Sequence, residues 1–248
     1  MNKINDKVTV ITGGNSGIGL GTAKLFKENG AKVITNAKSP SRLQETEEAY
    51  RDIFEGIYQA DLSDIHQVDG FFKNIKKDFG RIDILFLNAG IVQFSPIDMI
   101  TEELYDSHFD LNVKGMMFSV KAALPMMEQG GTIIMNSSTN VHKAMPYSSI
   151  YSATKAAIKA FAQVLTAELA PRGIRVNTLT PGPIQTPIID KMNMTEEQLA
   201  ASAEYIRTKV PLGRFGQPAE VATLVAEIAT NQFINGQEFI IDGGLTAL

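Results

Sequence analysis

Two side-chain pairs in this chain have the residue types and the spacing for proton transfer. Tyr151 and Lys155 stand four residues apart, as do Tyr205 and Lys209, and residues at that spacing lie on one face of a helix. A free tyrosine has a pKa of about 10, which a neighbouring ammonium lowers by favouring the phenolate. Such a tyrosine can act as a general acid toward a developing alkoxide. The surroundings favour the first pair, because Tyr151 begins a predicted helix that follows Ser138, whose hydroxyl could stabilise charge on a carbonyl oxygen.

A glycine-rich turn is the second feature with a chemical use. Gly13, Gly17 and Gly19 have the spacing G-x-x-x-G-x-G and lie between a predicted strand at 8–12 and a predicted helix at 17–29. Glycine permits a tight turn and a close approach of the backbone to a phosphate, and the helix amino terminus presents free N–H groups and the positive end of its dipole. No G-K-[ST] sequence follows, which disfavours a P-loop nucleotidase. The turn therefore predicts a site for the pyrophosphate of a dinucleotide.

Apolar runs alternate with amphipathic stretches along the whole chain. The pattern predicts strands at 8–12, 32–36, 57–58, 82–87, 132–136, 175–179 and 239–241, and helices at 17–29, 40–52, 65–79, 101–127 and 151–170. Near-continuous apolar strands that are each followed by a helix are typical of a parallel sheet with helices on both faces. We therefore expect one α/β domain over 1–248, with a doubly wound parallel sheet of about seven strands in three layers. The segment from Pro181 to Val210 interrupts the rhythm, and we interpret 183–210 as a lid over a binding crevice.

The composition excludes several classes of function. Of the 248 residues, 44% are hydrophobic and 20% charged, which is typical of a globular protein, and the net charge of −4 argues against a nucleic-acid partner. The absence of cysteine excludes disulfides, thiolate zinc sites and cysteine nucleophiles. The three histidines do not stand at a ligand-pair spacing, so we expect no metal site. We expect no signal peptide, and no apolar run reaches the ~20 residues that a membrane span needs. We expect a soluble cytoplasmic protein.

Polar residues follow two further strands that end at the same edge of the predicted sheet as the glycine turn. Asp61-Leu62 comes after the third strand and Asn88-Ala89-Gly90 ends the fourth. The carboxylate of Asp61 could accept a hydrogen bond from an adenine amino group, while the Leu62 backbone bonds the ring. Both segments also suit ordinary turns.

Taken together, these motifs resemble those of the short-chain dehydrogenase/reductase family, in particular its single-domain Rossmann-fold members of about this length. The resemblance rests on Thr12-Gly13-x-x-x-Gly17-x-Gly19, Asn88-Ala89-Gly90, Asn112, Ser138, Tyr151-x-x-x-Lys155 and Pro181-Gly182, in this order. It implies that Tyr151 is the catalytic acid/base, and that Lys155 binds the nicotinamide ribose and lowers the pKa of Tyr151. It further implies that Ser138 positions the substrate carbonyl and that Asn112 holds a water in a proton relay with Lys155.

The resemblance also implies a nicotinamide cofactor. The residues expected to bind it are Gly13, Asn15, Ser16, Gly17, Ile18, Gly19, Lys38, Asp61, Leu62, Asn88, Ala89, Gly90, Tyr151, Lys155, Pro181, Gly182, Ile184 and Thr186. NAD-preferring members carry an acidic residue at the end of the second strand, where this chain has Asn36-Ala37-Lys38-Ser39. Lys38, with Ser39 and Arg42 nearby, could pair with a 2′-phosphate, so we expect NADP(H) in preference to NAD(H). Ser16 departs from the basic residue that NADP-preferring relatives often carry there.

The substrate is less well specified. Candidate substrate contacts are Gln93, Ser138, His142, Tyr147 and Tyr151, and Phe94 and Ile184 should also rim the crevice. The leading hypothesis is an NADP(H)-dependent oxidoreductase that interconverts a ketone and a secondary alcohol, with a small-molecule substrate. The alternatives are a 3-oxoacyl thioester (acyl-carrier-protein) reductase and a non-catalytic dinucleotide-sensing protein. An enoyl reductase is less favoured, because such relatives space the tyrosine and lysine more widely.

Apolar residues beyond those needed for one sheet contact predict self-association. The predicted helix at 151–170 carries Ala156, Ala160, Phe161, Val164 and Ala167, and the helix at 101–127 carries Met116, Met117 and Phe118. Side by side on a monomer, these helices would expose a large apolar patch. The closing strand with residues 245–248 offers a second surface. Two different two-fold contacts predict a homotetramer, which the resemblance also implies.

Overall fold

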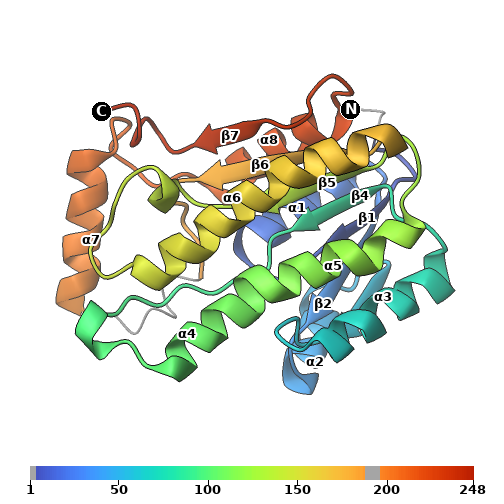
Figure 1. Ribbon diagram of the computed structural model, residues 1–248, viewed down its shortest axis with the longest axis horizontal. Helices are drawn as coiled ribbons and strands as arrows, with labels where there is room; N and C mark the ends of the chain where they lie inside the picture. The colour runs from blue at the N-terminus through green and yellow to red at the C-terminus, as the bar shows by residue number, and fades with distance from the viewer. Residues whose placement is uncertain (1–3, 188–195) are drawn as a thin grey trace.

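Seven parallel strands form one sheet in the computed structural model, which describes residues 4–187 and 196–248 (Figure 1). The order across the sheet is β3-β2-β1-β4-β5-β6-β7. The strands are β1 (Val8–Ile11), β2 (Lys32–Ala37), β3 (Gly56–Gln59), β4 (Ile84–Leu87), β5 (Thr132–Asn136), β6 (Arg175–Pro181) and β7 (Glu238–Ile241). The chain winds outward from β1 to β3 and then returns to β4, so a switch point lies between β1 and β4. The predicted doubly wound sheet is confirmed.

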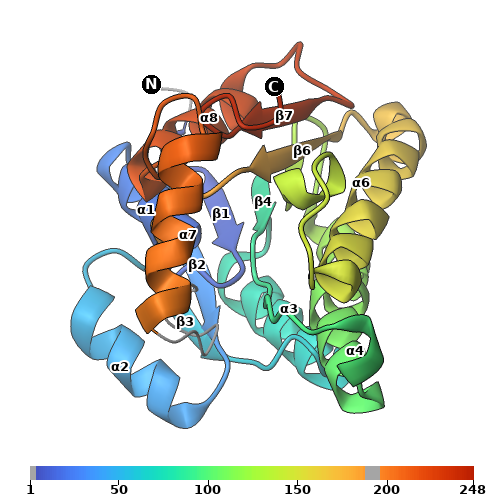
Figure 2. The same ribbon diagram turned by 90° about the vertical axis from the view of Figure 1, so that its left-hand side faces the viewer.

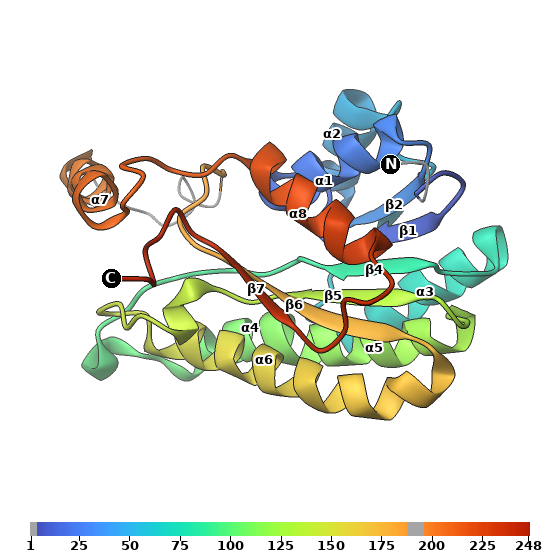
Figure 3. The same cartoon turned by 90° about the horizontal axis from the view of Figure 1, so that it is seen from above.

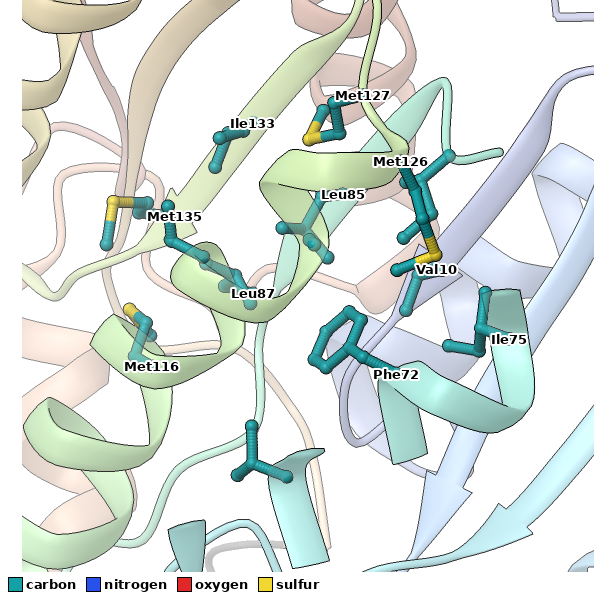
Figure 4. Packing of buried hydrophobic residues seen from close by; sticks show 14 of the residues in the cluster. Val10, Phe72, Ile75, Leu85, Leu87, Met116, Met126, Met127, Ile133 and Met135 are labelled. Atoms are coloured by element: carbon teal, nitrogen blue, oxygen red, sulfur yellow. The ribbon is translucent and has the colours of Figure 1, made fainter. Parts of the chain in front are cut away.

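Helices cover both faces of the sheet (Figure 3). On one face lie α1 (Gly17–Glu28), α2 (Pro40–Tyr50) and α8 (Pro218–Thr230), and on the other lie α3 (Ile65–Phe79), α4 (Glu102–Phe109), α5 (Met116–Ala123) and α6 (Ser149–Leu169). Successive strand residues point to opposite faces. Leu85 and Ile133 accordingly pack in the cluster under α3 and α5, beside Phe72 (Figure 4), while Phe86 and Ile134 pack in the cluster under α1 and α8. Burial on both faces explains why the central strands β1 and β4 are mostly apolar.

Two helical segments differ from the sequence prediction. The helix predicted at 101–127 is broken into α4, a π-helical turn at Asp110–Gly115, α5 and a 3₁₀ turn at Leu124–Met126. α8 was not predicted, although Pro218 occupies its first turn and Glu220 accepts a hydrogen bond from the Gln217 N–H at 2.7 Å, both of which are typical of a helix start. The other predicted elements are present, with ends that shift by a few residues.

The predicted lid at 183–210 lies partly outside the described residues, because 188–195 are not among them. Its described helix, α7 (Glu196–Lys209), stands beyond the carboxyl ends of the strands (Figures 1 and 2). Ile206 and Val210 anchor the end of α7 against Leu245 and Phe215. A lid role stays a prediction. Within the described part of the chain, no helix is long and apolar enough to cross a membrane.

Candidate active site

The glycine turn between β1 and α1 is held in place by side chains at the end of β2. The backbone N–H of Gly13 donates to Asn36 Oδ1 at 3.0 Å, and that of Gly14 donates to Thr35 Oγ1 at 2.9 Å. Gly13 and Gly17 have φ values of +63° and +51°, a region that favours glycine. A Cβ at Gly19 would overlap the Gly13 carbonyl oxygen. Thr35 and Asn36 were not predicted as site residues, although two polar side chains in a buried strand indicate a special role.

The amino terminus of α1 is open to an anion. Ser16 occupies the N-cap position but makes no side-chain hydrogen bond there, and the first turn carries no acidic residue. The first-turn N–H groups and the positive end of the helix dipole therefore remain available. Two predicted cofactor residues lie close to this helix end. Thr186 lies beside Gly17, since a Cβ added at Gly17 would be 3.0 Å from the Thr186 methyl group. Asn15 lies in the glycine turn itself, and its Nδ2 donates to Thr46 Oγ1 at 3.0 Å.

A continuous set of hydrogen bonds links the glycine turn to the predicted catalytic helix. Thr12 Oγ1 accepts from the backbone N–H groups of Asn88 and Ala89 at 2.9 and 3.0 Å. Asn136 Nδ2 donates to Asn88 Oδ1 at 3.0 Å, and Lys155 Nζ donates to the Asn136 carbonyl oxygen at 2.8 Å. These bonds cross from β1 through β4 and β5 to α6, so the ends of three strands position Lys155.

Lys155 is deeply buried, with 3% of its surface exposed. Burial disfavours the charged form and lowers the pKa of Lys155 from 10.5 to about 8. The ammonium lies 5.7 Å from the centre of the Tyr151 ring. The helix itself is tied to β5 next to Ser138, because Ser137 Oγ donates to the Lys155 carbonyl oxygen at 3.0 Å.

The pKa of Tyr151 is shifted in the direction opposite to the one we expected. Burial of the phenol raises the pKa above its ordinary value of 10.0, and the hydroxyl of Ser138 acts in the other direction as a hydrogen-bond partner. Lys155 Nζ donates to the Asn136 carbonyl oxygen in this structure. That Lys155 lowers the pKa of Tyr151 stays a prediction.

Asn112 occupies the π-helical turn and is fully buried. Its Nδ2 donates to the Ile91 carbonyl at 3.0 Å and to Thr154 Oγ1 at 3.1 Å, and its Oδ1 accepts from the Ile91 N–H at 2.9 Å. Such π turns often occur at functional sites. Gly115 ends the turn against Leu62, where a Cβ would overlap the Leu62 carbonyl oxygen. The close approach brings two predicted site segments, 61–62 and 112, into one region.

Lys38 and Asp61, predicted to bind different parts of a dinucleotide, are paired with each other. Lys38 Nζ lies 3.2 Å from Asp61 Oδ2, and Asp61 Oδ1 accepts from the Ser63 N–H at 3.0 Å and from its hydroxyl at 2.7 Å. Burial opposes ionisation of this carboxyl, but the bonds from Ser63 and Lys38 outweigh it and lower the pKa of Asp61. The Lys38 side chain remains 70% exposed.

Two of the predicted substrate contacts, His142 and Tyr147, differ in how far they are engaged by other residues. His142 Nε2 lies 2.7 Å from Glu238 Oε1, and Glu238 also binds Lys159 at 2.7 Å and Thr180 at 2.8 Å. A substrate contact through Nε2 of His142 would have to replace this pairing, and a substrate role for His142 stays a prediction. Tyr147 is 63% exposed, has a strained φ of 68°, and its carbonyl accepts from the Ser95 N–H at 2.8 Å.

The remaining predicted residues lie at the ends of β6 and β4. Gly182 follows β6 and donates to the Ile241 carbonyl at 2.9 Å, and Ile184 is buried and pairs with Gly216. Gln93 follows β4 and is exposed. The second tyrosine–lysine pair, Tyr205 and Lys209, lies on exposed positions of α7.

Comparisons with known proteins agree with the geometry. A family profile described as Enoyl-(Acyl carrier protein) reductase matches residues 13–246. An uncharacterized oxidoreductase of Methylorubrum extorquens is 36% identical over 250 residues, covering 99% of this chain and 100% of the relative. The 3-oxoacyl-(acyl-carrier-protein) reductase of Thermotoga maritima is 32% identical over 249 residues, covering 98% and 99%. A short chain dehydrogenase from Burkholderia cenocepacia, solved in complex with NADP, matches with a TM-score of 0.87 at 30% identity, covering 98% of this chain and 99% of that one.

The Rossmann-type sheet, the open glycine turn and the tyrosine–lysine helix define a dinucleotide-dependent oxidoreductase. The chain belongs to the short-chain dehydrogenase/reductase family, as its sequence predicted, and it is an enzyme that acts on CH–OH and C=O groups. The cofactor class of this family is NAD(P).

Proposed function

We propose that this enzyme interconverts a ketone and a secondary alcohol with NADP(H), and that Tyr151 transfers the proton. The observation that carries the proposal is the hydrogen-bonded path from the glycine turn through Asn88 and Asn136 to Lys155. It joins a dinucleotide cradle to a helix whose tyrosine has a serine hydroxyl as its neighbour. The expected cofactor site and the expected catalytic helix are thus connected by hydrogen bonds.

The residues present fit a nicotinamide dinucleotide. The uncapped first-turn N–H groups of α1 and the glycines at 13–19 would hold the pyrophosphate. Asn136 Oδ1 is buried and has no hydrogen-bond donor within the described part of the chain, so it offers an acceptor beside Lys155. When bound, the nicotinamide would supply or accept the hydride. Lys155 would direct its N–H groups toward the ribose hydroxyls.

Within this site, each side chain has one task in the reduction direction. Tyr151 would donate its phenolic proton to the substrate oxygen as that oxygen gains charge. Ser138 would donate a hydrogen bond to the same oxygen and stabilise the charge. Burial makes a phenolate at Tyr151 costly, and the Lys155 ammonium, which is charged at neutral pH with a pKa of about 8, would offset that cost. Oxidation would follow the same steps in reverse.

The surroundings of Lys38 support NADP(H). The end of β2 carries no acidic residue that would repel a 2′-phosphate. Lys38 pairs with Asp61, but its own side chain is 70% exposed, so its ammonium is also accessible to a phosphate dianion. The amino terminus of α2 begins directly afterwards, with Ser39 as its N-cap, and its dipole also favours an anion.

A pair of matched variants tests the proposed chemistry. Tyr151→Phe removes the transferable proton and keeps the ring, so kcat should fall by at least ~100-fold while the dissociation constant of NADPH stays unchanged. Tyr205→Phe, in the other tyrosine–lysine pair, should retain full activity. Oxidation and reduction are followed at the reduced-nicotinamide absorbance over a panel of ketones and secondary alcohols. Full activity in Tyr151→Phe together with loss of activity in Tyr205→Phe would refute the proposal, because the proton would then come from α7 rather than from α6.

A 3-oxoacyl thioester reductase is the second candidate, because the Thermotoga maritima relative is named as one. The carbonyl chemistry is the same, so only the substrate distinguishes the two. Adding a 3-oxoacyl thioester to the panel and comparing kcat/KM with that for simple ketones separates them. A kcat/KM for the thioester at least ~100-fold above the best ketone would select this candidate.

The exposed apolar residues support the proposed homotetramer. On α6, Ala156, Ala160, Val164 and Ala167 form an exposed stripe at helical spacing, and Met117 of the adjacent α5 is 40% exposed. In the segment 233–248, which contains the edge strand β7, Phe233 is 99%, Ile240 42% and Leu248 87% exposed. A second copy on each surface would remove these side chains from water.

A further inference from the structure

His108 is a fully buried histidine on α4 that the proposed chemistry does not use. Both ring nitrogens have partners: Nε2 lies 3.1 Å from the backbone nitrogen of Gln93, and Nδ1 lies 2.9 Å from the Leu104 carbonyl oxygen. The Gln93 N–H can only donate and the carbonyl can only accept. The ring therefore accepts through Nε2 and carries its proton on Nδ1, which fixes one tautomer.

The partner of His108 belongs to the same segment that Asn112 holds. Asn112 lies one helical turn further along and forms hydrogen bonds with both the N–H and the carbonyl of Ile91. Ile91 and Gln93 are alternate residues of an irregular segment that leaves β4 and runs toward α4 (Figure 2). Two side chains on one helix face thus fix the backbone of this segment at 91 and again at 93.

This segment connects the two halves of the candidate site. At its start, a Cβ at Gly90 would lie 3.5 Å from Lys155 Nζ. At its far end, the Ser95 N–H donates at 2.8 Å to the carbonyl of Tyr147, which lies four residues before Tyr151. A change in the path between Gly90 and Ser95 would therefore alter the wall of the site between Lys155 and Tyr151.

We infer that His108 is a positioning residue that sets the wall formed by residues 91–95 through the bond from the Gln93 N–H to its Nε2. It touches neither the substrate nor the cofactor in this role. The inference rests on the proposed function, because the wall matters only where a substrate carbonyl must be aligned beside Tyr151. Misplacement of a substrate by a fraction of an ångström is sufficient to slow a reaction that depends on alignment.

Two substitutions separate this role from simple packing. His108→Phe keeps a ring of similar size and removes the acceptor, whereas His108→Gln places a carbonyl oxygen near the position of Nε2. In His108→Phe, kcat/KM for the substrate should fall by ~10-fold or more, while the dissociation constant of NADPH changes by less than about twofold, because the glycine turn is untouched. His108→Gln should recover most of kcat/KM. The same two changes at His66, an exposed histidine of α3, should leave both constants at the wild-type values.

A spectroscopic measurement checks the bond without reference to activity. A long-range proton–nitrogen correlation spectrum of protein labelled with nitrogen-15 in histidine, recorded at neutral pH, should show His108 with the proton on Nδ1 and a bare Nε2. The signal is assigned by its loss in His108→Gln. A proton on Nε2 would overturn the inference even where His108→Phe fails to fold.

The kinetic outcomes are also distinct from failure of the proposed function. A wild-type enzyme that turns over while His108→Phe matches it in kcat/KM refutes the His108 assignment alone. A wild-type protein that is inactive on every carbonyl and alcohol tested with either cofactor refutes the proposed function, and the positioning role with it.

Discussion

Replacing Lys155 with methionine should change how the stability of the fold depends on pH. The amine is 3% exposed, and burial lowers its pKa from 10.5 to about 8. Below pH 8 both the folded and the unfolded chain carry the proton, so the cost of the buried charge is constant. Between about 8 and 10.5 the unfolded chain binds one more proton than the folded chain, and stability rises with pH wherever the unfolded state binds more protons.

The size of this effect follows from the interval between the two pKa values. At about 1.4 kcal/mol for each pH unit, the interval from about 8 to 10.5 corresponds to roughly 3 kcal/mol. Methionine has a similar length and no charge, so Lys155→Met lacks this contribution at every pH. The free energy of unfolding of the wild type, minus that of Lys155→Met, should be flat near pH 7 and rise by about 3 kcal/mol toward pH 10.5.

Urea unfolding followed by circular dichroism measures both proteins at one protein concentration and without cofactor. Burial raises the pKa of Tyr151 above 10.0, so most of the expected rise, between about pH 8 and pH 10, precedes the titration of Tyr151. Lys73→Met, which removes an exposed lysine from α3, controls for the loss of one positive charge. Curves for the wild type and Lys155→Met that run parallel from pH 7 to pH 10.5 would show that the buried amine of Lys155 does not destabilise the fold when it is charged.

Three further expectations follow from other parts of the molecule. Gly115→Ala should destabilise the fold by more than about 2 kcal/mol, because its Cβ would overlap the Leu62 carbonyl. Gly70→Ala in α3 has nothing within 4 Å of its Cβ, so it should stabilise the fold by about 0.5–1 kcal/mol. The same urea titration measures both variants. Ala37→Asp combined with Lys38→Ala should weaken NADPH binding relative to NADH by about 2–4 kcal/mol, and a wild type that prefers NADH in parallel titrations contradicts the proposed cofactor. Light scattering after size exclusion should give four times the chain mass of 27.0 kDa, and a mass equal to one chain would refute both proposed contacts.

The strands could be predicted from the sequence because their environment is uniform. Burial on both faces requires apolar residues throughout, as in the all-apolar strand β4, and that requirement is visible locally. The break between α4 and α5 was not predictable in the same way. The π turn is fixed by bonds from Asn112 to Ile91, which lies 21 residues earlier in the chain, and the apolar pattern of the helix continues across it.

The site shows the same division between local and distant information. The Tyr151–Lys155 spacing and the glycine turn are local features, and the sequence located both. The contacts that hold them are not local: Asn36 reaches Gly13 across 23 residues, and Asn136 reaches Asn88 across 48. α8 differs from these contacts, because its sequence signals are local. Pro218 and Glu220 in its first turn and the apolar Val221 and Val225 together predict a helix.

Burial acts on both members of the Tyr151–Lys155 pair. Burial raises the pKa of the phenol and lowers that of the amine, so it disfavours the phenolate and the ammonium alike. Each charge formed alone in this site is costly, but a phenolate formed beside an ammonium is compensated, because opposite buried charges stabilise one another. Lys155 is fixed by Asn136 and Ser137 at the end of β5, so the compensating charge is in place before Tyr151 gives up its proton. The proton affinity of the site is therefore a property of the coupled pair rather than of Tyr151 alone.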